Sequence, residues 1–480
     1  MAFFRRDNIT IYAKLKSHAA SLGVVKMVFI AAVLVLTGCG QKSDQTMKDD
    51  TMIKLMVLNP GHFHASLVQK TMYPGVDSTV YVYAPSGMEL NDYLSRVESY
   101  NNREENPTAW DIQLYTGDDF LEKMLEEQPG NLVVLAGNNR NKTDYITACV
   151  NAGLNVFSDK PMAISPAAFE QLKSAYEQAE QDGLLIYDIM TERSEITTML
   201  QKELSEQEGI FGGLIQGSLE EPAITKESVH HFFKYVSGKP LQRPAWFFDV
   251  KQQGEAIADV GTHLVDLIMW EAFPGSIQNY EEEIEFLSSR RWTTDMTAAQ
   301  FEKVTGVSEF PGFLSEYVVR DTLRAVANSA VDYTIRGTHA HVSVEWAFAA
   351  PEGAGDTHYS IMRGRLSDLV IRQGAEENYR PELYIVAKGD GTADALEVSL
   401  QLYMKEVLNE KYPGVALEQL EPGTWRLNIP ARYREGHEAH FARVTQRFLE
   451  YMEQGRLPEW ELTQMMAKYY TTTKAVELAE

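Results

Sequence analysis

Lys160, Asp259 and His263 are side chains that could together oxidise an alcohol. Moving a hydride to an acceptor while the hydroxyl proton leaves requires a base and a cation near the reacting oxygen. Lys160 offers the cation and His263 offers the base. Asp259 and His263 are spaced i,i+4 and Asp266 follows three residues later, so on one helix all three would share a face. The competing interpretation is structural, with Asp259 starting a helix and His263 buried among apolar neighbours.

The elements that must position these residues alternate between short apolar runs and helical stretches. Helical composition marks residues 142–152 and 166–181, the second with Ser165 as a predicted N-cap before a proline in the first turn. Five apolar runs are predicted strands: 53–58, 80–83, 132–136, 156–158 and 184–189. This alternation predicts an α/β fold with a parallel, Rossmann-type sheet, in which ligands bind at the carboxyl ends of the strands.

The turn after the first predicted strand reads Asn59-Pro60-Gly61-His62-Phe63-His64. A dinucleotide-binding fold carries G-x-G-x-x-G here, which lets the pyrophosphate approach a helix N-terminus. Only Gly61 keeps that pattern, and the second strand ends in Tyr83-Ala84-Pro85-Ser86 without a carboxylate for a ribose. Taken alone, this turn is equally typical of a structural Pro-Gly turn.

Three later segments carry a more specific pattern. They are residues 132–139 (LVVLAGNN), 156–162 (VFSDKPM) and 254–266 (GEAIADVGTHLVD). In this order they resemble the glucose-fructose oxidoreductase and inositol dehydrogenase family, often called Gfo/Idh/MocA, and the resemblance extends to the C-terminal region of an oxidoreductase branch of that family. It implies a nicotinamide-dependent enzyme with a Rossmann-type domain and a C-terminal α+β domain.

The resemblance also assigns roles to residues. Gly137-Asn138-Asn139 matches the family's turn under the nicotinamide ribose, Asp159-Lys160-Pro161 matches its E-K-P, and Asp259 with His263 matches its D-x-x-x-H. By resemblance, Lys160 contacts the substrate hydroxyl and the nicotinamide edge, His263 transfers the proton, and Asp259 orients the substrate or the imidazole. The residues implied to bind NAD or NADP are Asn59, Gly61, His62, Phe63, Ala136, Asn138, Asn139, Asp159, Lys160 and Pro161.

The segment before Asp259 contributes candidate substrate contacts. Arg243 and Trp246, followed by two phenylalanines, could form a wall for a sugar ring, although an aromatic core explains them equally well. His230 and His231 are neighbours on a predicted strand and point to opposite faces, so at most one of them lines the site. The predicted substrate-binding residues are His231, Arg243, Trp246 and Asp266.

The remaining histidines do not form a metal-binding motif. His437 and His440 are spaced i,i+3, and His339 alternates with His341. The sequence contains neither H-E-x-x-H nor a cysteine cluster. We expect no metal, and capping or surface roles for these histidines.

The N-terminal segment resembles an export signal. Residues 27–36 (MVFIAAVLVL) form an apolar run too short for the ~20 residues that span a bilayer and typical of a signal peptide. Leu36-Thr37-Gly38-Cys39 resembles the lipobox of bacterial lipoproteins, in which the cysteine is lipidated; an ordinary signal peptide is the alternative. We therefore expect a signal peptide over 1–38, a tether over 39–52, and a periplasmic lipoprotein anchored to a membrane of the bacterial cell envelope.

The rest of the chain divides into two predicted domains. Residues 53–190 form the dinucleotide-binding domain, and residues 191–480 form an α+β domain with an open, mostly antiparallel sheet that is a candidate surface for homo-oligomers. Acidic residues outnumber basic ones 68 to 44, a net charge of -24 that disfavours nucleic acid as a partner.

Three functions compete on this sequence. The first is a nicotinamide-dependent oxidoreductase acting on a hydroxyl, such as the C3 hydroxyl, of a sugar or glycoside. The second is a redox-neutral, NAD-dependent glycosidase of the same family, and the third is a non-catalytic sugar-binding lipoprotein. An exported enzyme meets no abundant nicotinamide pool, so we expect the cofactor to be tightly bound.

Overall fold

The computed structural model describes residues 52–236, 239–389 and 391–480. The predicted signal peptide, Cys39 and all but the last residue of the predicted tether lie outside the described residues. No helix in the described part of the chain is long and apolar enough to cross a membrane.

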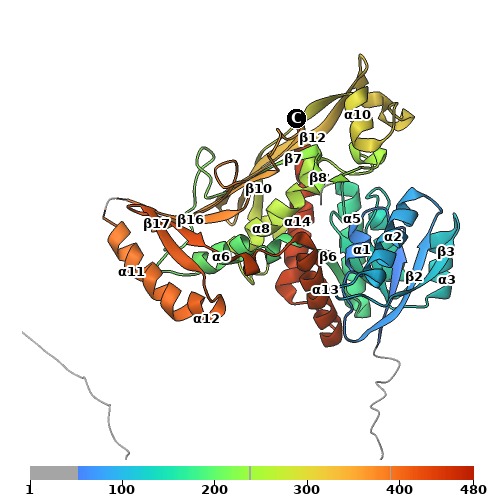
Figure 1. Cartoon of the computed structure of the whole chain (residues 1–480), viewed down its shortest axis with the longest axis horizontal. Coiled ribbons are helices and arrows are strands. Elements are labelled where there is room, and N and C mark those ends of the chain that lie inside the picture. The colour runs from blue at the N-terminus through green and yellow to red at the C-terminus, as the bar shows by residue number, and fades with distance from the viewer. Residues whose placement is uncertain (1–51, 237–238, 390) are drawn as a thin grey trace, which may run out of the picture. The chain divides into compact units, whose positions relative to one another are not determined.

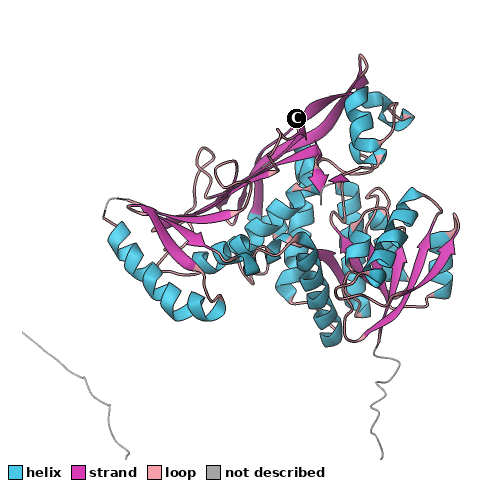
Figure 2. Cartoon of the chain, in the orientation of Figure 1, coloured by secondary structure: helices cyan, strands magenta, loops and turns pink. Residues whose placement is uncertain are grey.

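The first domain is built on a six-stranded parallel sheet (Figures 1 and 2). Its strands are β1 (Ile53–Leu58), β2 (Val76–Ala84), β3 (Asp111–Thr116), β4 (Leu132–Leu135), β5 (Asn155–Asp159) and β6 (Ile186–Ile189). They lie in the order β3-β2-β1-β4-β5-β6, so the strand order reverses between β1 and β4. The sequence-based prediction of a Rossmann-type parallel sheet is confirmed, and β3 is a strand that it missed.

Helices connect these strands. They are α1 (His64–Leu67), α2 (Met88–Asn102), α3 (Phe120–Glu127), α4 (Lys142–Asn151) and α5 (Pro166–Asp182). The predicted cap of α5 is present, because the Ser165 side chain accepts a hydrogen bond from the backbone N–H of Ala168 at 3.2 Å. The helix ends at Gly183, whose φ of 69° is a left-handed conformation that glycine adopts without strain.

The second domain is built on a ten-stranded sheet. Its strands are β7 (Ile224–Phe233), β10 (Ile284–Thr297), β11 (Val318–Val319), β12 (Thr322–Ile335), β13 (Thr338–Ala349), β14 (Thr357–Arg363), β15 (Ser367–Gln373), β16 (Glu382–Ala387), β17 (Ala416–Glu421) and β18 (Thr424–Asn428). The order is β10-β12-β13-β7-β14-β15-β16-β18-β17, and β11 pairs with β12. Neighbouring strands are antiparallel except β13 and β7, so the predicted mostly antiparallel sheet is confirmed. A separate short pair joins β8 (Tyr235–Val236) to β9 (Lys239–Pro240).

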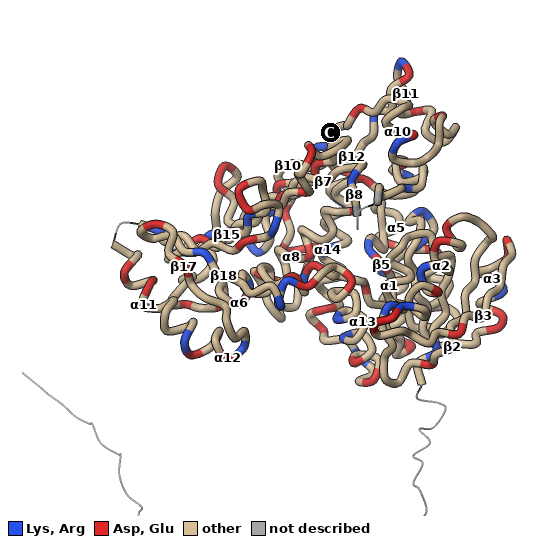
Figure 3. Tube along the Cα trace, viewed as in Figure 1, with Lys and Arg blue, Asp and Glu red and all other residues tan. Residues whose placement is uncertain are grey.

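The helices of the second domain lie between and after these strands. They are α6 (Ile196–Ser205), α7 (Ala256–Asp259), α8 (Gly261–Ala272), α9 (Tyr280–Glu283), α10 (Ala298–Thr305), α11 (Ala393–Tyr403), α12 (Asn409–Lys411), α13 (His437–Gln454) and α14 (Glu459–Leu478). Figure 3 shows acidic and basic residues distributed along both domains.

Helix α13 completes the core of the first domain. Its Phe441, Val444 and Phe448 are buried in the same apolar cluster as the residues of the parallel sheet. The Phe448 ring stacks on Phe157 of β5 and Tyr187 of β6, with ring centroids 5.0 and 5.4 Å apart. The end of the chain therefore returns to the strands that carry the candidate site, as the red helices of Figure 1 show.

The helix predicted to carry Asp259, His263 and Asp266 is divided. Asp259 ends α7 and the other two residues lie on α8. At the junction the backbone N–H of His263 donates to the carbonyl of Val260, three residues back, so the regular four-residue hydrogen bonding is interrupted. Of the three side chains, Asp266 binds Arg193 and does not share a site with Asp259.

Candidate active site

Lys160 and Asp259 form an ion pair between the two domains. Lys160 follows β5, Asp259 ends α7, and Lys160 Nζ lies 2.6 Å from Asp259 Oδ1. Burial alone would lower the pKa of Lys160, but Asp259 and then Asp159 outweigh burial and raise it. Burial alone would raise the pKa of Asp259, but the charge of Lys160 lowers it. Both groups are therefore ionised at neutral pH, and Lys160 is a cation rather than a base.

His263 lies on α8, one turn after Asp259. Burial, followed by the charge of Lys160, holds the pKa of His263 well below its ordinary value. The Nδ1 atom of His263 is buried and has no hydrogen-bond partner among the described residues. A neutral imidazole with a free ring nitrogen beside a lysine cation can accept a proton.

Asp159, at the end of β5, faces two histidines of the turn after β1. Its Oδ1 accepts the backbone N–H of Lys160 at 3.0 Å. Its Oδ2 lies 2.9 Å from His64 Nδ1 and 3.6 Å from His62 Nδ1. Behind it, the buried Lys142 Nζ donates to the Asp159 backbone carbonyl at 3.0 Å, and burial lowers the pKa of that lysine to about 8. His64 was not predicted as a site residue.

The predicted cofactor turns after β1 and β4 pack directly on each other. The backbone N–H groups of Gly61 and His62 donate to the Ala136 carbonyl at 3.1 and 3.2 Å. A Cβ atom on Gly137 would lie 2.6 Å from the Asn59 carbonyl oxygen, so this close approach requires a glycine at 137. Four of the residues predicted to bind the cofactor therefore lie together where the two turns meet: Asn59, Gly61, His62 and Ala136.

A loop of the second domain is fastened to the turn after β4. Asn138 donates to the side-chain oxygen of Gln252 at 2.9 Å, and Asn139 donates to the carbonyl of Gln253 at 2.8 Å. Residues 249–254 therefore cover this edge of the parallel sheet and lead directly into Asp259. Phe63 lies beside the turn, where its ring contacts His62 with centroids 4.6 Å apart.

Glu89 is a carboxylate that the sequence interpretation missed. It lies in the first turn of α2, and its Oε2 is 3.3 Å from the position that a Cβ on Gly61 would occupy. Its Oε1 accepts the indole N–H of Trp246 at 2.6 Å. Glu89 thus places a carboxylate beside the turn after β1 and joins that turn to Trp246. Trp246, a predicted substrate contact, binds the first domain instead of lining a separate wall.

Arg243 lies among aromatic rings. Its guanidinium lies 4.6 Å from the ring centroid of Phe247 and 4.8 Å from that of Trp346, and it donates to the carbonyls of Phe232 and His231. Burial lowers the pKa of Arg243 to about 10. Several of these rings and Asp259 line one small hollow. The aromatic run is therefore partly core and partly the wall of a hollow beside Asp259.

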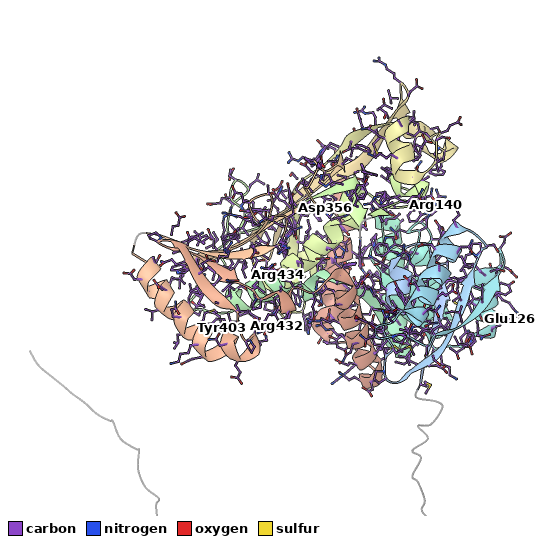
Figure 4. All side chains as sticks on the ribbon, in the orientation of Figure 1. Glu126, Arg140, Asp356, Tyr403, Arg432 and Arg434 are labelled. Atoms are coloured by element: carbon purple, nitrogen blue, oxygen red, sulfur yellow. The ribbon has the colours of Figure 1, made fainter. Side chains whose placement is uncertain are left out.

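His230 and His231 both contact one carboxylate, that of Asp356. Asp356, which is labelled in Figure 4, precedes β14. It lies 3.3 Å from His230 Nδ1 and 2.9 Å from His231 Nδ1, and Lys234 Nζ approaches it to 2.6 Å. Asp356 lies just before β14, which pairs with β7. Its carboxylate therefore contacts both of the neighbouring histidines near the end of β7. The sequence offered no signal for this contact, because Asp356 lies in a glycine-rich loop 125 residues from His231.

Asp266 does not join the candidate substrate contacts. Both of its oxygens accept hydrogen bonds from Arg193 at 2.7 Å, and Lys468 Nζ lies 3.0 Å from Oδ1. Arg193 also binds Glu461, and Lys468 also binds Asp188. The Asp266 side chain is 2% exposed. Its carboxylate is therefore used inside a buried ionic cluster that joins both domains to α14, and it is not available to a substrate.

His437 also differs from its predicted surface role. Its Nε2 lies 3.1 Å from His64 Nε2, in contact with the turn after β1. His440 is buried on the same helix, and His341 pairs with Asp332 at 2.6 Å on the second sheet. Sequence patterns could not show the His64–His437 contact, since 373 residues separate the two histidines.

Two family descriptions match the chain. "Oxidoreductase family, NAD-binding Rossmann fold" matches residues 88–186, and "Putative oxidoreductase C terminal domain" matches residues 200–480. A "putative oxidoreductase" from Parabacteroides merdae, solved as a crystal structure, is 52% identical, with a TM-score of 0.88 over 89% of this chain and 98% of that one. The chain therefore belongs to the Gfo/Idh/MocA oxidoreductase family. No curated protein matches it.

Two more distant structures share the fold. A levoglucosan dehydrogenase in complex with NADH is 13% identical, with a TM-score of 0.55 over 89% of this chain and 96% of that one. A 3-ketoreductase from Actinomadura kijaniata in complex with NADP and TDP-benzene is 12% identical, with a TM-score of 0.54 over 89% of this chain and 98% of that one. At these identities the likeness concerns the arrangement of the chain.

Proposed function

We propose that the chain is a nicotinamide-dependent dehydrogenase that oxidises a hydroxyl group of a sugar or glycoside. The observation that carries this proposal is the Lys160–Asp259 pair beside His263. It holds a permanent cation next to a neutral imidazole at the carboxyl end of a parallel strand. These are the two groups that removal of an alcohol proton requires.

The turns after β1 and β4 fit a dinucleotide. They meet where the strand order reverses, which is the position at which doubly wound sheets bind nucleotides. Gly61 and Gly137 allow the two turns to pack in direct contact, because a Cβ on Gly137 would lie 2.6 Å from the Asn59 carbonyl oxygen. The residues that would hold the group are those of the two turns together with Asp159 and Lys160. When bound, the nicotinamide supplies the acceptor for the hydride.

Three residues of the chain would carry out the proton transfer and the stabilisation of charge. Lys160 Nζ stabilises negative charge on the substrate oxygen as the proton leaves, and His263 accepts that proton. Asp259 fixes the direction of Lys160 and lowers its tendency to lose a proton. The loop over residues 249–254, bound to Asn138 and Asn139, excludes water from this edge.

A carbohydrate is the proposed substrate class. The hollow beside Asp259, lined by Trp346, Phe247 and Phe248, has room for little more than one water molecule, so its rings belong to the packing around Asp259 and the sugar would bind outside it. The fold likeness to a levoglucosan dehydrogenase and a 3-ketoreductase supports the same class, and C3 oxidation is the specific reaction that we propose to test first.

The proposal includes an envelope location and a retained cofactor. The lipobox-like segment ending at Cys39 supports a periplasmic lipoprotein. In that compartment a dissociating nucleotide would be diluted away, so we propose tight binding of NAD or NADP.

Mass spectrometry of nucleotide released from denatured, desalted protein tests the cofactor, and a glycoside panel with an added keto-sugar acceptor tests the reaction. Released NAD or NADP together with formation of a keto-glycoside supports the proposal. A nucleotide-free preparation that neither binds added NAD or NADP nor oxidises any glycoside would overturn it and favour a sugar-binding protein.

A further inference from the structure

Three potential metal ligands converge at the carboxyl ends of β1 and β5. The ligand atoms of His62, His64 and Asp159 all lie within 4.8 Å of one another. Both histidines present Nδ1 to the same carboxylate oxygen, Asp159 Oδ2, at distances of 3.6 and 2.9 Å. Ligand atoms that share a tetrahedral zinc ion lie about 3.3 to 3.6 Å apart, since each is about 2.0 to 2.2 Å from the metal. The His62 spacing of 3.6 Å agrees with that range, and the His64 spacing of 2.9 Å would have to lengthen slightly on binding.

The carboxylate of Asp159 is free of lysine on its histidine-facing side. Oδ1 binds the backbone N–H of Lys160, while Lys160 Nζ is engaged by Asp259. Lys142 Nζ donates to the backbone carbonyl of Asp159 and not to its carboxylate. The Asp159 side chain is only 6% exposed. Lys142 and Lys160 lie near this buried carboxylate without contacting Oδ2, where a proton on His64 or a metal ion can add positive charge.

His437 gives His64 the outer partner that metal-bound histidines usually have. Its Nε2 lies 3.1 Å from His64 Nε2, on the opposite side of the ring from Asp159. When His64 donates its Nε2 hydrogen to His437, its Nδ1 presents a lone pair toward the carboxylate. In that tautomer a metal ion can take the place of the proton that otherwise joins His64 Nδ1 to Asp159 Oδ2 at 2.9 Å. His62, 35% exposed, leaves one side of the cluster open to solvent.

We propose that His62, His64 and Asp159 bind a divalent transition-metal ion such as Zn²⁺, with His437 as the hydrogen-bond partner that orients His64. Two imidazoles and one carboxylate match the ligand preference of zinc and its neighbours in the first transition series. Three protein ligands leave a coordination position free toward the exposed side of His62. No sequence motif could show this site, because its ligands come from residues 62 to 159 and its outer partner from residue 437.

Cobalt(II) titration of the metal-stripped full-length protein tests the site without nucleotide or substrate. We expect visible absorption bands of a four- or five-coordinate cobalt centre at one equivalent, and displacement of cobalt by Zn²⁺. Metal analysis of protein purified without chelator should give about one ion per chain. His64→Gln and Asp159→Asn should each weaken cobalt binding more than 100-fold, while His437→Gln should weaken it by about 10- to 100-fold as an outer partner does.

Thermal unfolding provides a second readout that separates loss of the site from misfolding. Zn²⁺ at 100 times its dissociation constant should stabilise the wild-type protein by about 2.7 kcal/mol, and this increment should vanish in His64→Gln even if that variant is intrinsically less stable. His341→Gln is the matched control, because His341 also faces a carboxylate but has no second histidine on it. Absence of cobalt bands at millimolar cobalt, or equal losses in His341→Gln, would overturn the metal site. His62 and Asp159 also belong to the proposed cofactor site, so both readouts use the ion alone, without nucleotide or substrate, and their outcome is distinct from that of the dehydrogenase assay.

Discussion

Lys160 Nζ and Asp259 Oδ1 lie 2.6 Å apart although 99 residues separate them in the chain. The contact joins the end of a strand in the first domain to the end of a helix in the second. The contact needs both domains, so Asp259 of the second domain holds in place the Lys160 cation that we propose for catalysis. The ion pair therefore links domain docking to the arrangement of the reacting groups.

The first prediction concerns that ion pair. Lys160→Met keeps most of the side-chain volume but removes the charge that stabilises the developing alkoxide, so kcat/KM should fall by about 10² to 10³ with unchanged circular dichroism. Lys173→Met, which removes an exposed lysine paired with Glu281, should leave kcat/KM unchanged. An unaltered rate constant in Lys160→Met would remove this lysine from the mechanism.

The Lys160–Asp259 ion pair should also affect the free energy of unfolding. Asp259→Asn leaves the Lys160 charge buried without a partner and should lower the free energy of unfolding by about 3 kcal/mol. The double variant Lys160→Met/Asp259→Asn should recover part of that loss, because no unpaired charge remains. Urea denaturation of the four proteins of this cycle measures the coupling, and strictly additive losses would contradict a direct interaction.

The second prediction concerns pH and His263. Its pKa is lower in the folded chain than the ~6.5 of an unfolded histidine, so below about pH 6.5 the unfolded chain binds more protons. The free energy of unfolding should therefore decrease as the pH falls below 6.5, and His263 can contribute up to about 1.4 kcal/mol per pH unit. Above pH 6.5 this contribution is constant.

Urea unfolding at pH 7.5, 6.0 and 5.0 tests this assignment. His263→Gln should lose less stability than the wild type between pH 6.5 and 5.0, and kcat/KM of the wild type should keep its plateau to below pH 6.5. Parallel pH dependences of the two proteins would show that His263 does not contribute, and that the other buried histidines with lowered pKa values, such as His62 and His358, account for the slope.

Much of the fold was predictable because its signals are local. β4 is a run of four buried residues, and such a run between helical stretches indicates a central parallel strand. β3 was missed because it lies at the sheet edge, where most of its residues keep contact with solvent and no apolar run is required. Ser165 was identified as a cap because the cap and the helix it begins are adjacent in sequence.

The site was predictable only where its residues lie in a family pattern. Lys160 and Asp259 were found through such patterns and proved to be in contact. Asp266 shares the pattern, but its partners Arg193 and Lys468 lie 73 and 202 residues away, so no local spacing reveals that they occupy its carboxylate. Glu89 and His437 reach the site through tertiary packing alone. Composition and periodicity carry no information on such contacts.

The third prediction concerns Glu89 and cofactor preference. Its carboxylate lies next to Gly61 in the proposed cofactor turn, so it repels an anionic nucleotide. Glu89→Gln should strengthen binding of NADP about 3- to 10-fold more than binding of NAD, because the additional phosphate of NADP carries nearly two further charges. Glu98→Gln, an exposed acid further along α2, is the control for a general charge effect. Calorimetric titration with both nucleotides measures the difference, which should diminish at high salt; equal changes for both nucleotides would place Glu89 away from the bound cofactor.

The fourth prediction concerns the N-terminal cysteine. If Cys39 is the lipidated residue, wild-type protein should take up a labelled fatty acid and fractionate with membranes, whereas Cys39→Ser should do neither. Cys149→Ser is the control, since that thiol is buried in the first domain. A wild-type protein that takes up no label would contradict the lipoprotein proposal while leaving the proposed catalytic residues untouched.

The fifth prediction separates a structural from a substrate-binding role for Asp266. Asp266→Asn leaves Arg193 and Lys468 buried with less negative charge between them, so the free energy of unfolding should fall by about 3 to 5 kcal/mol. Asp295→Asn breaks an exposed pair with Arg324 and should cost less than about 1 kcal/mol. Because the Asp266 carboxylate faces its cluster and not the hollow beside Asp259, the KM and kcat of folded Asp266→Asn protein should stay within about threefold of wild type, a change equivalent to less than 1 kcal/mol. Urea denaturation and steady-state kinetics on the same preparations test both expectations. A large rise in KM together with wild-type stability would indicate that Asp266 binds the substrate.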